Sequence, residues 1–243
     1  MMVNKMKDII NSEIYKLTIR KKYQKIVFAS IVVITLANVY FFICKKVDSL
    51  EYLLVYFDKI YGMILVLTAI YNYIFQEDFT YDVHKNHMWI FGNLKKLFRG
   101  KLFVQIVLVT LNYLVVAIPT VLFLGFSKRE MIGQDAIIII MFSYYFILLR
   151  TLMVINIFTN LWHNDYVTFV LGWLTVNVLG LLTGVIEDVL KVGNIVSSHT
   201  IQGQMVGLVP NTINNGGFTV DIVINIFLVL VGIIICEYIY KKH

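Results

Sequence analysis

Long apolar runs separated by short polar segments occupy most of the chain. A membrane-spanning helix needs about 20 mostly apolar residues, and six stretches satisfy this requirement: 26–44, 57–75, 102–125, 135–158, 166–186 and 219–240. The pattern predicts an all-α polytopic membrane protein whose six transmembrane helices form a single transmembrane domain over residues 1–243. The first run follows a basic start but precedes no small-residue cleavage site, so we expect a retained helix and not a signal peptide.

The N-terminal segment, residues 1–25, shows the periodicity of an amphipathic helix from residue 4 onward. Its apolar residues recur at helical spacing as Met6, Ile10, Ile14 and Leu17. The opposing polar stripe consists of Lys5, Asp8, Ser12 and Lys16. Such an interfacial helix is predicted to lie along the inner membrane surface, with its basic residues near anionic headgroups. A simple basic anchor ahead of the first span is the alternative.

The loop between the second and third runs, residues 76–101, begins polar and acidic and ends in a short amphipathic helix. The apolar residues of this helix recur at helical spacing as Ile90, Phe91, Leu94, Leu97 and Phe98. An apolar face without an evident partner inside the chain favours contact with the membrane surface or with another protein.

The segment between the fifth and sixth runs, residues 187–218, is rich in glycine. Its semi-apolar part, residues 192–209, could re-enter the membrane if surrounding protein buries its backbone. An ordinary surface loop explains the composition equally well.

The distribution of positive charge orients the helices, because cytoplasmic loops carry an excess of Lys and Arg. Fourteen of the 21 Lys and Arg residues lie in the N-terminal segment, the 76–101 loop and the C-terminus, whereas six lie in segments on the other side. Both termini of this multi-pass protein are therefore predicted to face the cytoplasm. The net charge of +6 reflects this anchoring. Since no soluble basic domain is expected, we predict no nucleic-acid binding.

Catalytic and metal-binding patterns are weak in this sequence. Gly100–Lys101 is followed by Leu102, where an ATP-binding loop needs Ser or Thr. His84 and His87 lie near acidic residues but have no further strong ligands at suitable spacing. We find no Ser-His-Asp, Cys-His or paired-carboxylate grouping typical of an enzyme. The sequence therefore predicts no catalytic residue, no metal site and no cofactor on this chain.

Arg150 is the only formal charge deep inside a predicted span. Charges in that position usually face a polar interior or a partner, so Arg150 could line a substrate path or meet a second subunit. A structural role, in which it reaches the membrane surface or a backbone carbonyl, is equally well supported. Tyr144 and Tyr145 in the same span could line a cavity, although core packing is the more common role of such residues.

Each predicted span also contains one asparagine whose amide could hydrogen-bond another helix. These residues are Asn38, Asn72, Asn112, Asn156, Asn177 and Asn225.

The predicted architecture resembles the permease subunit of a type-2 ABC exporter. Such subunits have an amphipathic helix ahead of six spans and a coupling helix in the loop between the second and third. The N-terminal sequence from Asn11 to Leu17, followed by Arg20-Lys21-Lys22, is similar to the family's opening. The loop resembles the family pattern at Asp78-Phe79, Lys85-Asn86, Gly92, Lys95 and Gly100-Lys101. It departs at Asp82-Val83, where Gly-Thr is common.

The resemblance implies partners that composition alone does not. A dimer of ABC ATPase subunits would bind ATP and Mg and dock beneath the loop, and a second permease copy or a homologue would complete the pathway within the membrane lipid. The small members that this chain is similar to export amphipathic or antimicrobial peptides, as in bacteriocin-immunity systems and phenol-soluble modulin exporters. The resemblance therefore implies a peptide substrate and the bacterial cytoplasmic membrane. The implied coupling residues are Glu77, Asp78, Phe79, Lys85, Trp89, Phe91 and Lys95.

A second hypothesis explains the same features without an ATPase. The chain would then be a membrane immunity or signalling protein that binds a peptide directly, and its polar residues would serve anchoring and packing. A neighbouring ATPase gene, or its absence, would discriminate between the two.

Overall fold

The computed structural model describes residues 2–19, scattered positions between 25 and 40, residues 94–126 and 134–192, positions 198, 200, 201 and 204, and residues 218–242. Every element in these ranges is a helix. The predicted span 57–75 lies outside the described residues, and only scattered positions of the span 26–44 fall within them.

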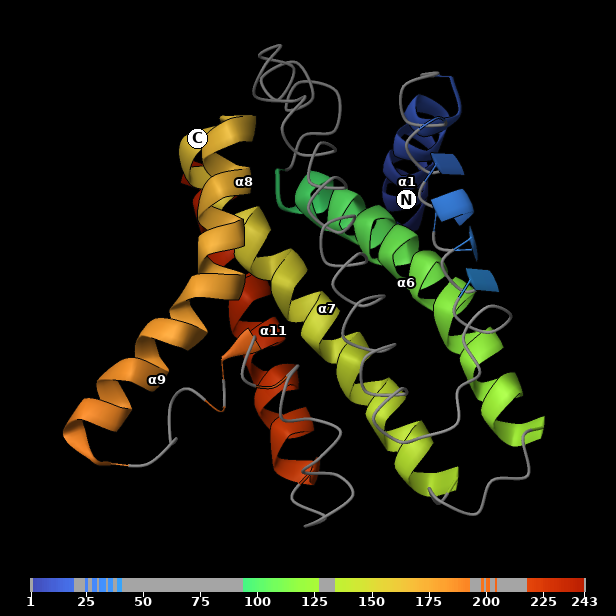
Figure 1. Ribbon diagram of the computed structural model, residues 1–243. Coiled ribbons are helices and arrows are strands. Elements are labelled where there is room, and N and C mark those ends of the chain that lie inside the picture. The colour runs from blue at the N-terminus through green and yellow to red at the C-terminus, as the bar shows by residue number, and fades with distance from the viewer. Residues whose placement is uncertain are drawn as a thin grey trace.

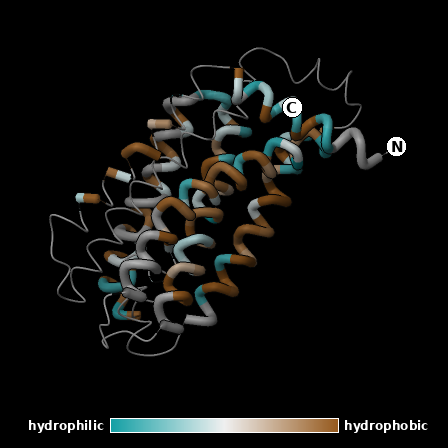
Figure 2. Tube along the Cα trace, turned by 90° about the vertical axis from the view of Figure 1, so that its right-hand side faces the viewer, coloured by the Kyte–Doolittle hydropathy of each residue, from teal (hydrophilic) through white to brown (hydrophobic). Residues whose placement is uncertain are grey.

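Three described helices are long and apolar enough to cross a bilayer. They are α6 (Leu94–Phe126), α7 (Gln134–Trp162) and α11 (Phe218–Lys242), with 33, 29 and 25 residues. At a rise of about 1.5 Å per residue, each exceeds the roughly 30 Å hydrocarbon core of a bilayer. Apolar residues dominate much of their length (Figure 2). These helices coincide with the third, fourth and sixth predicted spans and indicate a membrane protein.

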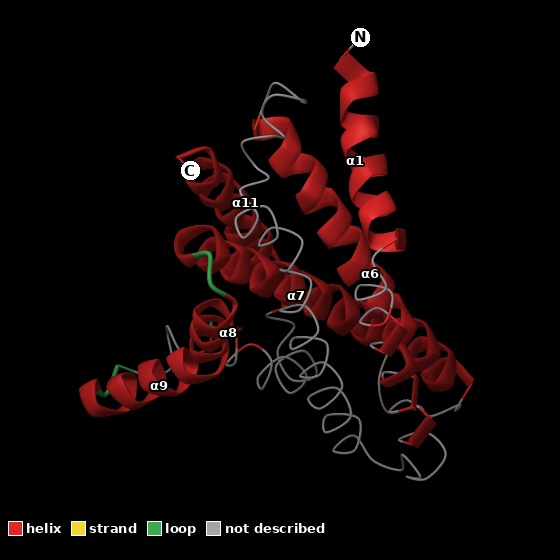
Figure 3. Ribbon diagram, turned by 90° about the horizontal axis from the view of Figure 1, so that it is seen from above, coloured by secondary structure: helices red, strands yellow, loops and turns green. Residues whose placement is uncertain are grey.

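Helix α7 is the centre of the described bundle and contacts α6, α8 and α11. In the view of Figure 1 the chain runs down along α6, up along α7 and, after α8 and α9, up again along α11. The start of α6 and the end of α11 therefore lie at the same end of the bundle. Seen from above, α7 lies between α8 and α6 (Figure 3). Gly232 lets α11 approach α7 closely, because a Cβ atom there would lie 2.7 Å from the Cβ of Met153.

The fifth predicted span is helical but is not one regular α-helix. It consists of α8 (Asp165–Trp173), the π-helical segment η2 (Leu174–Val178) and α9 (Leu179–Leu190). The hydroxyl of Thr175 donates a hydrogen bond of 2.8 Å to the carbonyl oxygen of Leu171, an arrangement that often bends helices. π-helical turns are a second established cause of bending, and the ribbon changes direction between α8 and α9 (Figure 1).

Helix α1 (Met2–Ile19) confirms that the N-terminal segment is helical, but its buried face differs from the predicted apolar stripe. Ile9 and Glu13, one turn apart, are buried, whereas Ile14 is 47% exposed. The reason is that α1 packs on α6, where Gly100 leaves space for Ile9: a Cβ at Gly100 would lie 2.5 Å from the Ile9 Cγ2 atom.

The segment between α9 and α11 enters the bundle at its described positions. Thr200, Ile201 and Gln204 are buried, and Ile201 belongs to the main hydrophobic core. The backbone N–H of Gln204 donates to the carbonyl oxygen of Thr200 at 2.9 Å, which forms a helical turn. The described positions of this segment therefore pack within the protein.

Candidate functional site

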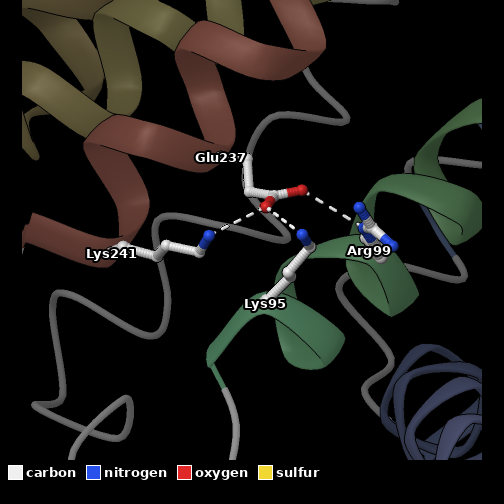
Figure 4. A network of polar contacts seen from close by, with 4 residues as sticks. All are labelled: Lys95, Arg99, Glu237 and Lys241. Atoms are coloured by element: carbon white, nitrogen blue, oxygen red, sulfur yellow. Dashed lines mark hydrogen bonds and ion pairs between the residues drawn. The ribbon is translucent and has the colours of Figure 1, made fainter.

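Four charged residues meet where the start of α6 approaches the end of α11. Oxygen atoms of the Glu237 carboxylate lie 2.9 Å from Lys241 Nζ, 3.3 Å from Lys95 Nζ and 3.2 Å from Arg99 Nε (Figure 4). The carboxylate side chain is 13% exposed, whereas the three basic side chains are 43–52% exposed. We call these four residues the Glu237 cluster; it joins α6 to α11 through charge as well as packing.

The spacing of the cluster follows from the helical repeat. Lys95 and Arg99 lie four residues apart at the start of α6, and Glu237 and Lys241 lie four residues apart at the end of α11. Residues at this spacing share one face of a helix, so each helix presents its pair to the other. Lys95, a predicted coupling residue, is therefore bound within the chain by α11.

A second ion pair holds α1 against α6. Glu13 lies 3.3 Å from the Nζ atom of Lys101, and Lys16 approaches the same Glu13 oxygen at 2.8 Å. The Lys101 side chain is only 1% exposed, so its charge depends on protein groups and not on water. The first two turns of α6, residues 94–101, thus contact both the N-terminal helix and the C-terminal helix.

Arg150 lies in α7 within a group of polar side chains. Its Nη1 atom donates hydrogen bonds of 3.3 Å to the amide oxygens of Gln204 and Asn225. The Gln204 amide nitrogen in turn lies 3.4 Å from a carboxylate oxygen of Asp221. Gln204 and Asn225 are 2% and 0% exposed. The guanidinium therefore joins α7, the segment around residue 204 and α11 in one polar network.

The two tyrosines predicted beside a substrate path make packing contacts in the described bundle. Tyr144 is 2% exposed and belongs to the core. The Tyr145 hydroxyl is 2.9 Å from the Thr110 hydroxyl of α6, and its ring centroid is 5.2 Å from that of Tyr113. These contacts hold α6 and α7 together.

Two asparagines of the predicted set form the hydrogen bonds between helices that were expected. Asn225 accepts from Arg150, as described above. Asn156 of α7 and Gln105 of α6 exchange two hydrogen bonds, of 2.8 Å and 3.2 Å, and both residues are 0% exposed. Gln105 was not singled out from the sequence, although it is the one glutamine within the third predicted span.

Most predicted coupling residues, Glu77, Asp78, Phe79, Lys85, Trp89 and Phe91, lie outside the described residues, as do His84 and His87. In the part of the chain that the structure describes, no group of three or more His, Cys, Asp or Glu residues could hold a metal ion. Neither the known protein families nor the curated proteins contain a match to this chain.

Proposed function

We propose that this chain is the membrane-spanning permease subunit of an ATP-driven ABC exporter that moves amphipathic or antimicrobial peptides out of a bacterial cell. The proposal combines the sequence resemblance with one structural observation. Residues 94–101, the C-terminal part of the predicted coupling loop 76–101, are fixed to α1 by Glu13–Lys101 and to α11 by the Glu237 cluster. A displacement of the loop would therefore be transmitted to both α1 and α11.

In this mechanism ATP binds a separate pair of ATPase subunits that dock beneath the loop. Their closure would displace residues 76–93 and, with them, the start of α6. Because ion pairs and the Ile9–Gly100 contact tie α6 to α1 and α11, these helices would move as a rigid body. The movement would be passed to α7, which packs on both α6 and α11.

The peptide path in this proposal passes Arg150 of α7. The guanidinium is held by the amide oxygens of Gln204 and Asn225, in a network that also includes the carboxylate of Asp221. In this proposal an acidic group of a passing peptide would contact the guanidinium.

The first experiment is affinity purification of the tagged protein from its own host in mild detergent, with co-purifying chains identified by mass spectrometry. We expect a stoichiometric ATPase subunit. An ATPase-free preparation that survives crosslinking would refute the exporter proposal and favour the immunity or signalling hypothesis, to be followed by direct peptide-binding measurements.

A charge reversal tests the coupling loop itself. Asp78→Lys should lower peptide transport and the stimulation of the ATPase while membrane insertion is unchanged. The matched control is Asp188→Lys, because Asp188 is an exposed carboxylate on α9, a helix that lies away from α6 in Figure 1. Equal transport by the two variants would contradict the assignment of Asp78 to the coupling surface.

A further inference from the structure

The Glu237 cluster has more positive than negative charge. Lys95, Arg99 and Lys241 surround one carboxylate, which leaves two positive charges in excess among these four residues. The carboxylate is nearly buried while the basic side chains are about half exposed. Because the Arg99 and Lys241 side chains remain about half exposed beside this carboxylate, a negatively charged group outside the protein would complement them.

Apolar side chains are exposed one turn deeper along both helices. Phe103 follows Arg99 by four residues on α6 and is 50% exposed. On α11, Ile234 precedes Glu237 by three residues and is 68% exposed, and Tyr238 precedes Lys241 by three and is 70% exposed. Residues at these spacings share a helix face. At 1.5 Å per residue, Phe103 and Ile234 lie about 5 to 6 Å deeper than Arg99 and Glu237, and Tyr238 lies at about the level of Glu237.

The position of the cluster along the two candidate spans matches the level of lipid headgroups. Lys95 and Arg99 lie in the first two turns of the span that begins at Leu94, and Glu237 and Lys241 lie in the last two turns of the span that ends at Lys242. Basic pockets between transmembrane helices at this level are known to bind anionic lipid headgroups. A ligand that fits both layers has an anionic head and apolar tails.

We propose that the Glu237 cluster is a binding site for one anionic phospholipid, held between the start of α6 and the end of α11. The phosphate contacts the exposed guanidinium group of Arg99 and amino group of Lys241, and the acyl chains lie along Phe103, Ile234 and Tyr238. Glu237 orients the cations and at the same time opposes the phosphate. The site would exist whether or not the chain works with an ATPase.

The test is retention of dioleoyl phosphatidylglycerol, compared with dioleoyl phosphatidylcholine, by the full-length protein in detergent, measured by native mass spectrometry. We expect one tightly retained phosphatidylglycerol per chain. A basic residue near a membrane surface changes anionic-lipid affinity by about fivefold, so Arg99→Gln with Lys241→Gln should weaken retention by roughly 25-fold. The matched control is Lys7→Gln with Lys25→Gln, two exposed lysines outside the cluster, whose variant should retain the lipid.

Glu237→Gln separates lipid binding from a purely structural role. Removing the opposing charge should strengthen phosphatidylglycerol retention by about fivefold. If the cluster instead affected lipid only by holding α6 against α11, Glu237→Gln would weaken retention, because it breaks that contact. Arg99→Lys keeps the charge and should retain the lipid even if the glutamine variants fold poorly. Weaker retention in Glu237→Gln, equal loss in the Lys7 and Lys25 control, or displacement of the lipid by millimolar inorganic phosphate would overturn the proposal.

Discussion

Replacing Asn156 with leucine should destabilise the contact between α6 and α7 by removing both bonds of its pair with Gln105. The two amides are 0% exposed and exchange hydrogen bonds of 2.8 Å and 3.2 Å. Leucine has a similar size but offers no partner, so the Gln105 amide would remain buried without that partner.

The magnitude follows from hydrogen bonds measured between membrane helices. These contribute on average ~0.6 kcal/mol and at most ~1.7 kcal/mol each. Loss of two such bonds should therefore lower the free energy of unfolding by about 1 to 3 kcal/mol. Gln105→Leu should cost a similar amount. The double variant should cost less than the sum of the two, because no amide is left behind.

The assay is reversible unfolding in mixed micelles by increasing SDS, followed by tryptophan fluorescence, for the wild type, both single variants and the double variant. The swap Gln105→Asn with Asn156→Gln serves as a control, because it keeps one amide on each helix and should recover most of the stability. Distant sites add within about 0.3–0.5 kcal/mol. Additivity of the two leucine variants within that range would refute the pairing.

Two further contacts give predictions of the same kind. Gly232→Leu should separate α11 from α7 and lower the free energy of unfolding by roughly 1–3 kcal/mol or more, since even a Cβ atom would lie 2.7 Å from Met153 Cβ; unchanged SDS unfolding would contradict this close approach. Glu13→Gln should destabilise the docking of α1 by about 3–5 kcal/mol because it leaves the Lys101 charge buried without Glu13, and it should expose α1 to limited trypsin digestion. Adding Lys101→Met should restore much of the protection, and a double variant as sensitive as Glu13→Gln would count against the ion pair.

The sequence predicted those elements whose signal is local. The apolar runs at 102–125, 135–158 and 219–240 correspond to α6, α7 and α11, because a span of about 20 apolar residues has few alternatives. Their ends agree within four residues except at the start of α6, which begins eight residues earlier, at Leu94. Hydrogen bonding by Asn156 and Asn225 was also predictable, because an amide in an apolar run needs a partner. The identity of each partner was not, since Gln105 is 51 residues from Asn156 and Gln204 is 54 residues from Arg150.

Features that depend on contacts between distant helices could not be read from periodicity. The helical spacing of the N-terminal segment placed Ile14 on its apolar face. In the structure Ile9 is buried instead, because it packs in the space beside Gly100. Similarly, Glu237 resembles an ordinary interfacial carboxylate in the sequence, and only the return of α11 to the start of α6 surrounds it with three cations. The predicted coupling residues at 77–91 lie outside the described chain and stay predictions.

The π-helical segment Leu174–Val178 sets the direction in which the following helix presents its side chains. A π-helical hydrogen bond encloses one residue more than an α-helical one, and in a helix of 3.6 residues per turn one residue corresponds to about 100° of rotation. Leu182, Val185 and Ile186 of α9 are all more than half exposed in their present orientation. If Leu174–Val178 adopted a regular α-helix with every residue kept, these three side chains would turn by roughly a quarter of a circle, whereas deleting one residue would restore the regular repeat and leave them facing as they do now. The surface that α9 offers to lipid or to a neighbouring chain thus depends on the π-helical turn upstream, and not on the amino acids of that surface alone.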